Sequence, residues 1–174
     1  MSMSSLFDSV RAIQSELAVN PGVISKIEDD IPKADEKNLY DVFVTDKELR
    51  KITGKLFANG HHARAVEEAY KFLNNLVKKR SGLNNADGAG LMRQAFSANS
   101  PVLKLNAGTN RSEQDEQAGY MDLFAGCMTG IRNPRVHEHE WEDSEQRALQ
   151  LLAMANHLVE RVRLSEKATN KNSE

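Results

Sequence analysis

Arginine and histidine side chains stand close together in the stretch Ile131–His139, and their types suit phosphate chemistry. Arg132 and His137 have four residues between them, and Asn133 directly follows the arginine. A histidine with an ordinary pKa of about 6.5 can accept or donate a proton near neutral pH. An arginine stays cationic and can bind phosphate oxygens through two N–H groups at once. The pair therefore has the residue types needed to move a proton and to stabilise charge that develops on a phosphate ester.

The spacing is weak evidence by itself, because the arginines and histidines of this chain give about one such match by chance. A metal site formed by His137, Glu138 and His139 is a rival interpretation, but no cysteine or third histidine lies near them in the sequence. We therefore expect no metal and no other cofactor. Arg132 could also be a helix-terminal charge placed favourably against the helix dipole, with His137 an unrelated loop residue.

Other side chains have optional roles in such chemistry. Arg135 either assists phosphate binding or is only a surface charge, and His139 is a candidate supporting residue. Trp141 can stack on a nucleobase, but a lone tryptophan before a helix is more often a packing anchor. His61–His62 is interpreted as a solvated first turn of a helix, and His157 as a partly buried packing residue.

One helix must position Arg132. Apolar periodicity predicts a helix from Ser112 into Arg132, with its core positions at Gln117, Met121, Phe124, Met128 and Ile131. Asn133–Pro134 is expected to end this helix sharply, because the residue before a proline avoids the α region and proline has no N–H. Gly126 and Gly130 lie one turn apart on the helix and leave a ridge nearly bare of side chains. The ridge packs against a helix of its own bundle, which is our preferred interpretation, or against a second copy of the chain.

The remaining pattern predicts an all-α bundle of four to five helices with a small N-terminal helical appendage. Residues 1–44 are interpreted as the appendage and a linker, ending in an extended piece at 39–44, residues 45–166 as the helical domain, and 167–174 as a disordered tail. Thr45 and Glu48 form a capping box before a helix that stops at Asn59–Gly60. A long helix follows, with the stripe Ala63, Val66, Tyr70, Leu73 and Val77. Asp87 caps a shorter helix, 101–105 is an extended connection, and the last helix begins near Asp143.

Composition limits the partners and the compartment. The net charge of −2 does not imply a general electrostatic grip on nucleic acid, so any contact with RNA or DNA is expected through a local patch. The single cysteine, Cys127, excludes an internal disulfide and is interpreted as a small helix residue rather than a nucleophile. No apolar run approaches the length that crosses a bilayer, and Met1–Ser5 lacks a signal-peptide pattern. We expect a cytoplasmic protein with no membrane partner.

Five stretches occur in an order that resembles one protein family. They are Ala63–Lys71, Gly90–Phe96, Pro101–Leu105, Tyr120–Gly126 and Ile131–Glu138. Together they resemble the Ymh-like family of bacterial and phage HEPN proteins, over roughly residues 46 to 165. Because the stretches are several and ordered, they are far more specific than the Arg132–His137 spacing alone.

The resemblance implies a HEPN-type helical bundle that is generally dimeric, in which the motifs of two protomers meet and form a metal-independent endoribonuclease site. Arg132 and His137 are then the active pair, and Asn133 is the polar residue that follows the arginine. Such proteins are associated with toxin–antitoxin, abortive-infection and phage-conflict systems, so the implied partners are RNA, a second copy and an antitoxin. Attack by the RNA 2′-hydroxyl leaves a 2′,3′-cyclic phosphate and spares DNA.

A second hypothesis is a non-catalytic HEPN module that binds RNA or a protein partner through the same face. Geometry separates the two hypotheses. If Arg132 and His137 point apart, or lie far from any two-fold contact, the module gains support.

Overall fold

The computed structural model describes residues 39–138 and 140–168, all of them in one compact unit, Asn38–Glu174. The helices and linker predicted before residue 39, His139, and residues 169–174 of the predicted tail lie outside the described part. None of the described helices is both long and apolar enough to cross a membrane.

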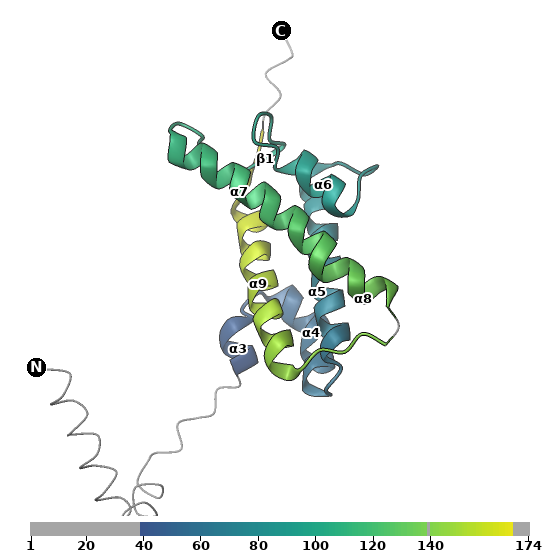
Figure 1. Cartoon of the computed structure of the whole chain (residues 1–174). Coiled ribbons are helices and arrows are strands. Elements are labelled where there is room, and N and C mark those ends of the chain that lie inside the picture. The colour runs from purple at the N-terminus through teal and green to yellow at the C-terminus, as the bar shows by residue number, and fades with distance from the viewer. Residues whose placement is uncertain (1–38, 139, 169–174) are drawn as a thin grey trace, which may run out of the picture. The chain divides into compact units, whose positions relative to one another are not determined.

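The described chain is a helical bundle, which confirms the predicted fold class (Figure 1). Its helices are α3 (Leu39–Phe43), α4 (Lys47–Ala58), α5 (His62–Ser81), α6 (Gly88–Ala95), α7 (Arg111–Cys127), the π-helical turn η1 (Met128–Arg132), α8 (Asn133–His137) and α9 (Glu145–Leu164). Two short strands, β1 (Leu103–Lys104) and β2 (Glu166–Lys167), pair antiparallel with Leu103 opposite Lys167. The extended connection predicted at 101–105 is thus confirmed, and Lys167, assigned to the tail, lies in β2.

Helix α5 forms the centre of the bundle, because it packs along α4 and α9 and is crossed by η1. Four positions of its predicted stripe, Val66, Tyr70, Leu73 and Val77, have no exposed surface. Their spacing of three and four residues places them on one side of the helix. Helices α6 and α7 close the upper part of the bundle in Figure 1. The long helical run that begins with α7 therefore packs against α6 and, through η1, against α5.

The extended piece expected at 39–44 is wrong, because Leu39–Phe43 is the helix α3. Tyr40 and Val44 are four residues apart, face the same way and are buried, with α3 packed on α9. The Tyr40 hydroxyl lies 2.7 Å from the Thr53 hydroxyl, and its ring stacks on Phe57 with centroids 5.0 Å apart. The alternating apolar residues that suggested a strand are a short helix held by tertiary contacts.

The capping box expected at Thr45 is also wrong. The N-cap of α4 is Asp46, whose carboxylate accepts hydrogen bonds from the backbone N–H groups of Glu48 and Leu49. Thr45 is hydrogen-bonded to α9 instead, because its backbone N–H donates to Asn156 Oδ1 at 2.9 Å. The predicted cap of α6 is confirmed, because the side chain of Asp87 accepts from the N–H of Gly88.

Candidate functional site

The helix that carries Arg132 does not end at Asn133–Pro134, so the predicted sharp break is wrong. Asn133 has ordinary helical dihedrals (φ −60°, ψ −44°), and its N–H donates to the carbonyl of Met128 across the π turn η1. Pro134 is the second residue of α8, directly after this π turn, and the helix continues through it. Helices α7, η1 and α8 form one continuous run, and π turns of this kind are frequent at functional sites.

Arg132 ends η1, and its guanidinium group forms no hydrogen bond or ion pair with another residue of the described ranges. Its Nε is buried and has no hydrogen-bond acceptor among the described residues. A Cβ added to Gly88 would lie 3.8 Å from Arg132 Nη1, so the guanidinium reaches the N-terminus of α6. Burial raises the pKa of the Asp87 carboxyl, but hydrogen bonds from Asn74 and Gly88 and the charges of Lys78 and Arg132 lower it overall. Arg132 thus lies near a helix N-terminus, where anions are favoured, and has no ion pair within the described part of the chain.

His137 lies on the exposed last turn of α8 and forms no hydrogen bond or ion pair with another described residue. His137 comes five positions after Arg132, so the two side chains leave an ideal helix in directions about 140° apart. Asn133, between them, is half-buried. Within one chain the motif therefore points its arginine and its histidine to different sides of the run.

Arg135 is buried and structural, so its interpretation as a surface charge is wrong. Its Nε and Nη2 donate to the two carboxylate oxygens of Asp143, both at 2.7 Å, and its Nη1 donates to the carbonyl of Ile131 at 2.7 Å. The side chains of Arg135 and Asp143 are 1% and 0% exposed. The Arg135 guanidinium also lies 5.4 Å from the centre of the Trp141 ring. This pair ties the segment before α9 to α8, next to His137, and leaves none of the Arg135 nitrogens free for phosphate.

Trp141 is held in the way expected of a packing anchor. Its Nε1 lies 3.4 Å from Asp143 Oδ1, and a second guanidinium, that of Arg147, lies 5.7 Å from the ring centre. The ring is nevertheless only half-buried.

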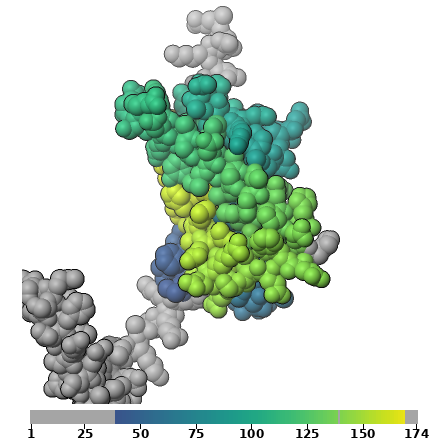
Figure 2. Space-filling model, viewed as in Figure 1, coloured from purple at the N-terminus to yellow at the C-terminus, as the bar shows by residue number. Residues whose placement is uncertain are grey.

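The glycine ridge faces away from its own bundle. A Cβ added to Gly126 or Gly130 would meet nothing within 4 Å, and both residues are exposed. Our preferred interpretation, that the ridge packs against a helix of the same bundle, is therefore wrong. Gly119 and Leu123 fall on the same side of the helix, and Leu123 is 41% exposed. We call these four residues the open strip. In Figure 2 the green α7–α8 run lies uncovered across one face of the molecule.

The other histidines have structural surroundings. His157 is exposed rather than partly buried, which corrects the sequence interpretation, and its Nε2 lies 2.7 Å from the Tyr120 hydroxyl. His61 is exposed as expected, whereas His62 is half-buried with its ring 5.2 Å from that of Phe57. His139 lies outside the described residues. Among residues 39–138 and 140–168 no three His, Cys, Asp or Glu side chains gather as a set of metal ligands.

Cys127 has the surroundings of a packing residue, as predicted. It is buried, and its Sγ lies 3.6 Å from Met154 Sδ. Burial raises the pKa of its thiol to about 11 despite a hydrogen bond from Tyr70. The nucleophilic thiolate form is therefore scarce near neutral pH.

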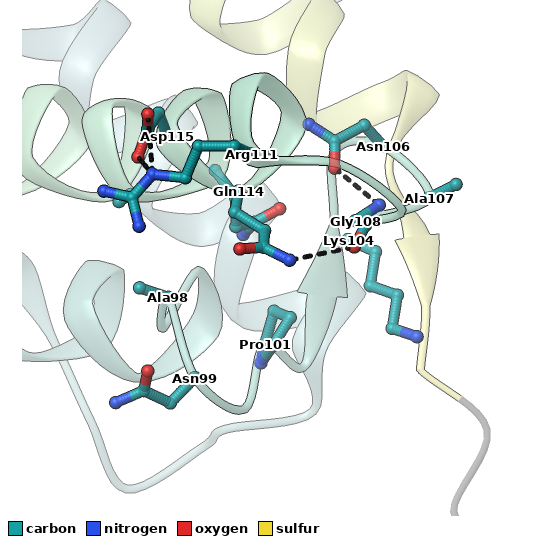
Figure 3. Close-up of a pocket in the computed structure, with 12 residues that line it drawn as sticks. Ala98, Asn99, Pro101, Lys104, Asn106, Ala107, Gly108, Arg111, Gln114 and Asp115 are labelled. Atoms are coloured by element: carbon teal, nitrogen blue, oxygen red, sulfur yellow. Dashed lines mark hydrogen bonds and ion pairs between the residues drawn. The ribbon is translucent and has the colours of Figure 1, made fainter.

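A large hollow lies at the opposite end of the helical run from Arg132 (Figure 3). It measures about 610 Å³ and lies at the N-terminus of α7, beside the loop that follows β1. Its arginine, Arg111, is paired with Asp115 at 3.0 Å, and its amide Gln114 donates to the carbonyl of Gly108 at 3.4 Å. A helix of this length separates Arg111 from Arg132 by about 30 Å. The hollow and the motif are therefore separate places.

Two smaller hollows, of about 370 and 400 Å³, lie beside the motif. Trp141, Ala63 and Arg64 belong to the walls of both, and Val136 and Glu138, on either side of His137, line the smaller one. Sequence reasoning missed both hollows, since their walls come from α5 and from residues some seventy positions later. Trp141, which lines both hollows, is the wall residue for which the sequence suggested stacking on a nucleobase.

The comparison with protein families gives one match. A family model described as "Protein of unknown function (Hypoth_ymh)" matches residues 44–162, which include the helices α4 to α8 and most of α9. No curated protein and no solved structure matches the chain.

Proposed function

The chain belongs to the Ymh family, and we propose that it is a metal-independent endoribonuclease of the HEPN type that works in a toxin or phage-defence setting. Arg132 and His137 are its proposed active pair, and Asn133 supports them as a neighbouring polar group. His139 keeps its proposed supporting role, whereas Arg135 acts by positioning the residues around it.

The unpaired guanidinium of Arg132 is the observation that carries the proposal. A buried Nε without an acceptor is costly, and native proteins rarely leave such a group unused. Arg161, which also has an unpaired buried Nε, differs because its Nη2 binds Glu116 at 2.9 Å. A guanidinium binds phosphate oxygens through two parallel charge-assisted N–H groups, as it binds carboxylates. We propose that a phosphate of the RNA supplies the acceptor that the described residues do not give to Arg132 Nε.

The reaction needs only the groups of the motif and the RNA itself. The 2′-oxygen attacks phosphorus, its proton passes to one histidine, and the bond from phosphorus to the 5′-oxygen breaks. A second histidine gives its proton to the departing 5′-oxygen, so the products are a 2′,3′-cyclic phosphate and a free 5′-hydroxyl. Arg132 stabilises the negative charge that builds on the phosphate oxygens. One histidine cannot serve as base and acid in the same step, so two copies of His137 are required.

The proposed dimer supplies the second copy. The open strip is bare of side chains at Gly119, Gly126 and Gly130 and carries one exposed leucine, so the backbone of another helix can approach it closely. A two-fold axis near the strip would turn the His137 of one chain toward the Arg132 of the other. The divergence of the two side chains by about 140° within one helical run supports the proposal that a partner completes the site. An antitoxin that covers this face would block the same contacts.

The alternative function is a non-catalytic module that binds RNA or a protein partner through Arg132. The same divergence of Arg132 and His137 favours this alternative if the protein is a monomer. RNA binding that survives His137→Ala, with no cleavage product, is its signature.

The test is cleavage of single-stranded RNA by the purified protein in excess chelator. We expect 2′,3′-cyclic phosphate ends from the wild type, and a loss of at least about a hundredfold in rate for His137→Ala and for Arg132→Ala. His157→Ala is the matched control, because His157 is an exposed histidine on α9. The His157→Ala protein should cleave RNA at the wild-type rate. No cleavage by the wild type, or equal cleavage by His137→Ala, refutes the enzymatic function.

A further inference from the structure

The smaller hollow beside the motif has the dimensions of a ligand site. Its volume of about 370 Å³ falls within the range of roughly 300–1,000 Å³ that is usual for small-molecule pockets. Its walls come from α5, from α8 and from Trp141, and we call it the Trp141 hollow. Val136 and Glu138, the chain neighbours of His137, line it, so a group bound there lies against the end of α8 that carries His137.

Most polar groups of the Trp141 hollow are already paired. Glu67 is 9% exposed in its side chain and binds Lys71 at 2.5 Å and Arg64 at 2.8 Å. All three nitrogens of the Arg135 guanidinium are engaged, as described above. Arg64 also binds Glu68 at 2.8 Å, but its side chain remains 55% exposed. These groups form a fixed wall rather than free ligands.

Glu138 is the exception. Its backbone N–H donates to the carbonyl of Pro134 at 2.9 Å, which fixes its position at the end of α8. Its carboxylate is exposed and forms no hydrogen bond or ion pair with any other residue in the described part of the chain. The hollow therefore offers a free carboxylate, the half-buried ring of Trp141 and the partly exposed guanidinium of Arg64.

We propose that the Trp141 hollow is a nucleobase subsite that holds a guanine of the RNA beside the cleaved phosphate, and this inference rests on the proposed ribonuclease function. Proteins read unpaired RNA bases by contact with aromatic rings and guanidinium planes and by hydrogen bonds to the Watson–Crick edge. Trp141 and Arg64 provide the flat contacts. Glu138 provides the hydrogen-bond acceptors.

The preference for guanine follows from the chemistry of the carboxylate. An ionised carboxylate only accepts hydrogen bonds, and its two oxygens match two neighbouring donors. Guanine presents such a pair, the N1–H and the 2-amino group. Adenine and cytosine place a ring nitrogen acceptor beside their amino group, and uracil flanks its single N–H with two carbonyls. Each of these three bases therefore sets an acceptor against Glu138, which is unfavourable.

The experiment uses the fluorescence of Trp141, the single tryptophan of the chain, so that the signal reports the hollow itself. The full-length protein is titrated with short 2′-O-methyl oligouridylates that carry one guanosine, adenosine, cytidine or inosine. These RNAs cannot be cleaved, because the attacking 2′-hydroxyl is blocked. We expect the guanosine oligomer to change the fluorescence and to bind about tenfold more tightly than the uridine, adenosine or cytidine oligomers. Inosine, which keeps N1–H but lacks the 2-amino group, should fall between.

Two matched variants test the role of the carboxylate. Glu138→Gln should remove the preference for guanine without affecting folding, because the side chain is exposed. Glu140→Gln is the control, since Glu140 is an exposed glutamate of the same segment that lines neither hollow, and it should keep the preference. Equal binding of all bases, no fluorescence change on saturation, or a guanine preference that survives Glu138→Gln overturns the proposal.

The outcome is separable from that of the cleavage test. Cleavage of RNA in chelator without a guanine preference refutes the base subsite and leaves the ribonuclease intact. A guanine preference in the titration without any cleavage supports the subsite as part of the non-catalytic module and refutes the enzyme.

Discussion

The buried pair of Arg135 and Asp143 allows a quantitative prediction. Their side chains are 1% and 0% exposed and are joined by two hydrogen bonds of 2.7 Å. Asp143→Ala leaves the Arg135 guanidinium buried without a counter-charge, which typically costs about 3–5 kcal/mol of the free energy of unfolding. Arg147 does not replace the lost carboxylate, because it is itself a cation and lies 3.5 Å from the same oxygen. We therefore expect the upper half of this range.

Urea unfolding followed by far-UV circular dichroism measures this loss. The double variant Arg135→Met with Asp143→Leu removes both charges at similar volume and should be far less destabilised than Asp143→Ala. Asp115→Ala is the control, since its ion pair with Arg111 is 59% and 85% exposed and contributes at most about 0.5 kcal/mol. A loss of less than about 1 kcal/mol in Asp143→Ala, with an unchanged denaturant slope, would refute the view that this pair holds the segment before α9 against α8.

Three further changes test other parts of the structure. A Cβ added to Gly126 meets nothing within 4 Å among the described residues, so Gly126→Leu should fold normally but lower the dimer fraction in sedimentation velocity. The same change at Gly90, where an added Cβ is equally free, should leave the dimer fraction unchanged. Cys127, whose pKa is raised to about 11 by burial, should react slowly with a thiol reagent at pH 8 and rapidly in urea, and equal rates in the folded and unfolded protein would contradict its burial. Because the unfolded thiol has a pKa of about 8.5, the contribution of Cys127 to stability is complete below that pH and is lost as the pH rises toward 11. Burial raises the pKa of Asp46, but hydrogen bonds from Arg163 and from the N–H groups of Leu49 and Glu48 lower it overall. Asp46→Ala should therefore lower the free energy of unfolding by about 1 kcal/mol at pH 7, and its difference from wild type in thermal unfolding should shrink as the pH falls below about 4.

The sequence predicts the elements whose signals are local. The stripe of α5, the cap at Asp87 and the C-terminal end of α4 follow from residues within a few positions of one another, and the structure contains them. The sequence does not predict α3, because this short helix is held by side-chain contacts with α4 and by packing on α9, which lies about a hundred positions later. A five-residue helix has too little periodicity to be distinguished from a strand.

The motif shows the same division between local and tertiary signals. Arg132 and His137 are visible as residue types, but no local residue pattern indicates the π turn that carries the helix through Pro134, and η1 packs against the distant α5. Arg135 finds its partner eight residues away only because the chain folds back after α8. A glycine carries no apolar signal, so the outward direction of Gly126 and Gly130 follows only from the fold.

The measurement that tests the central claim most directly uses mixtures of wild-type and His137→Ala chains, unfolded together, refolded, and assayed for cyclic-phosphate ends on RNA in excess chelator. If two copies of His137 serve one site, activity follows the square of the wild-type fraction, so an equal mixture retains about one quarter of the wild-type rate. Activity proportional to the wild-type fraction, about one half in the same mixture, would contradict a site shared between two chains. No cleavage at any composition would contradict the ribonuclease itself.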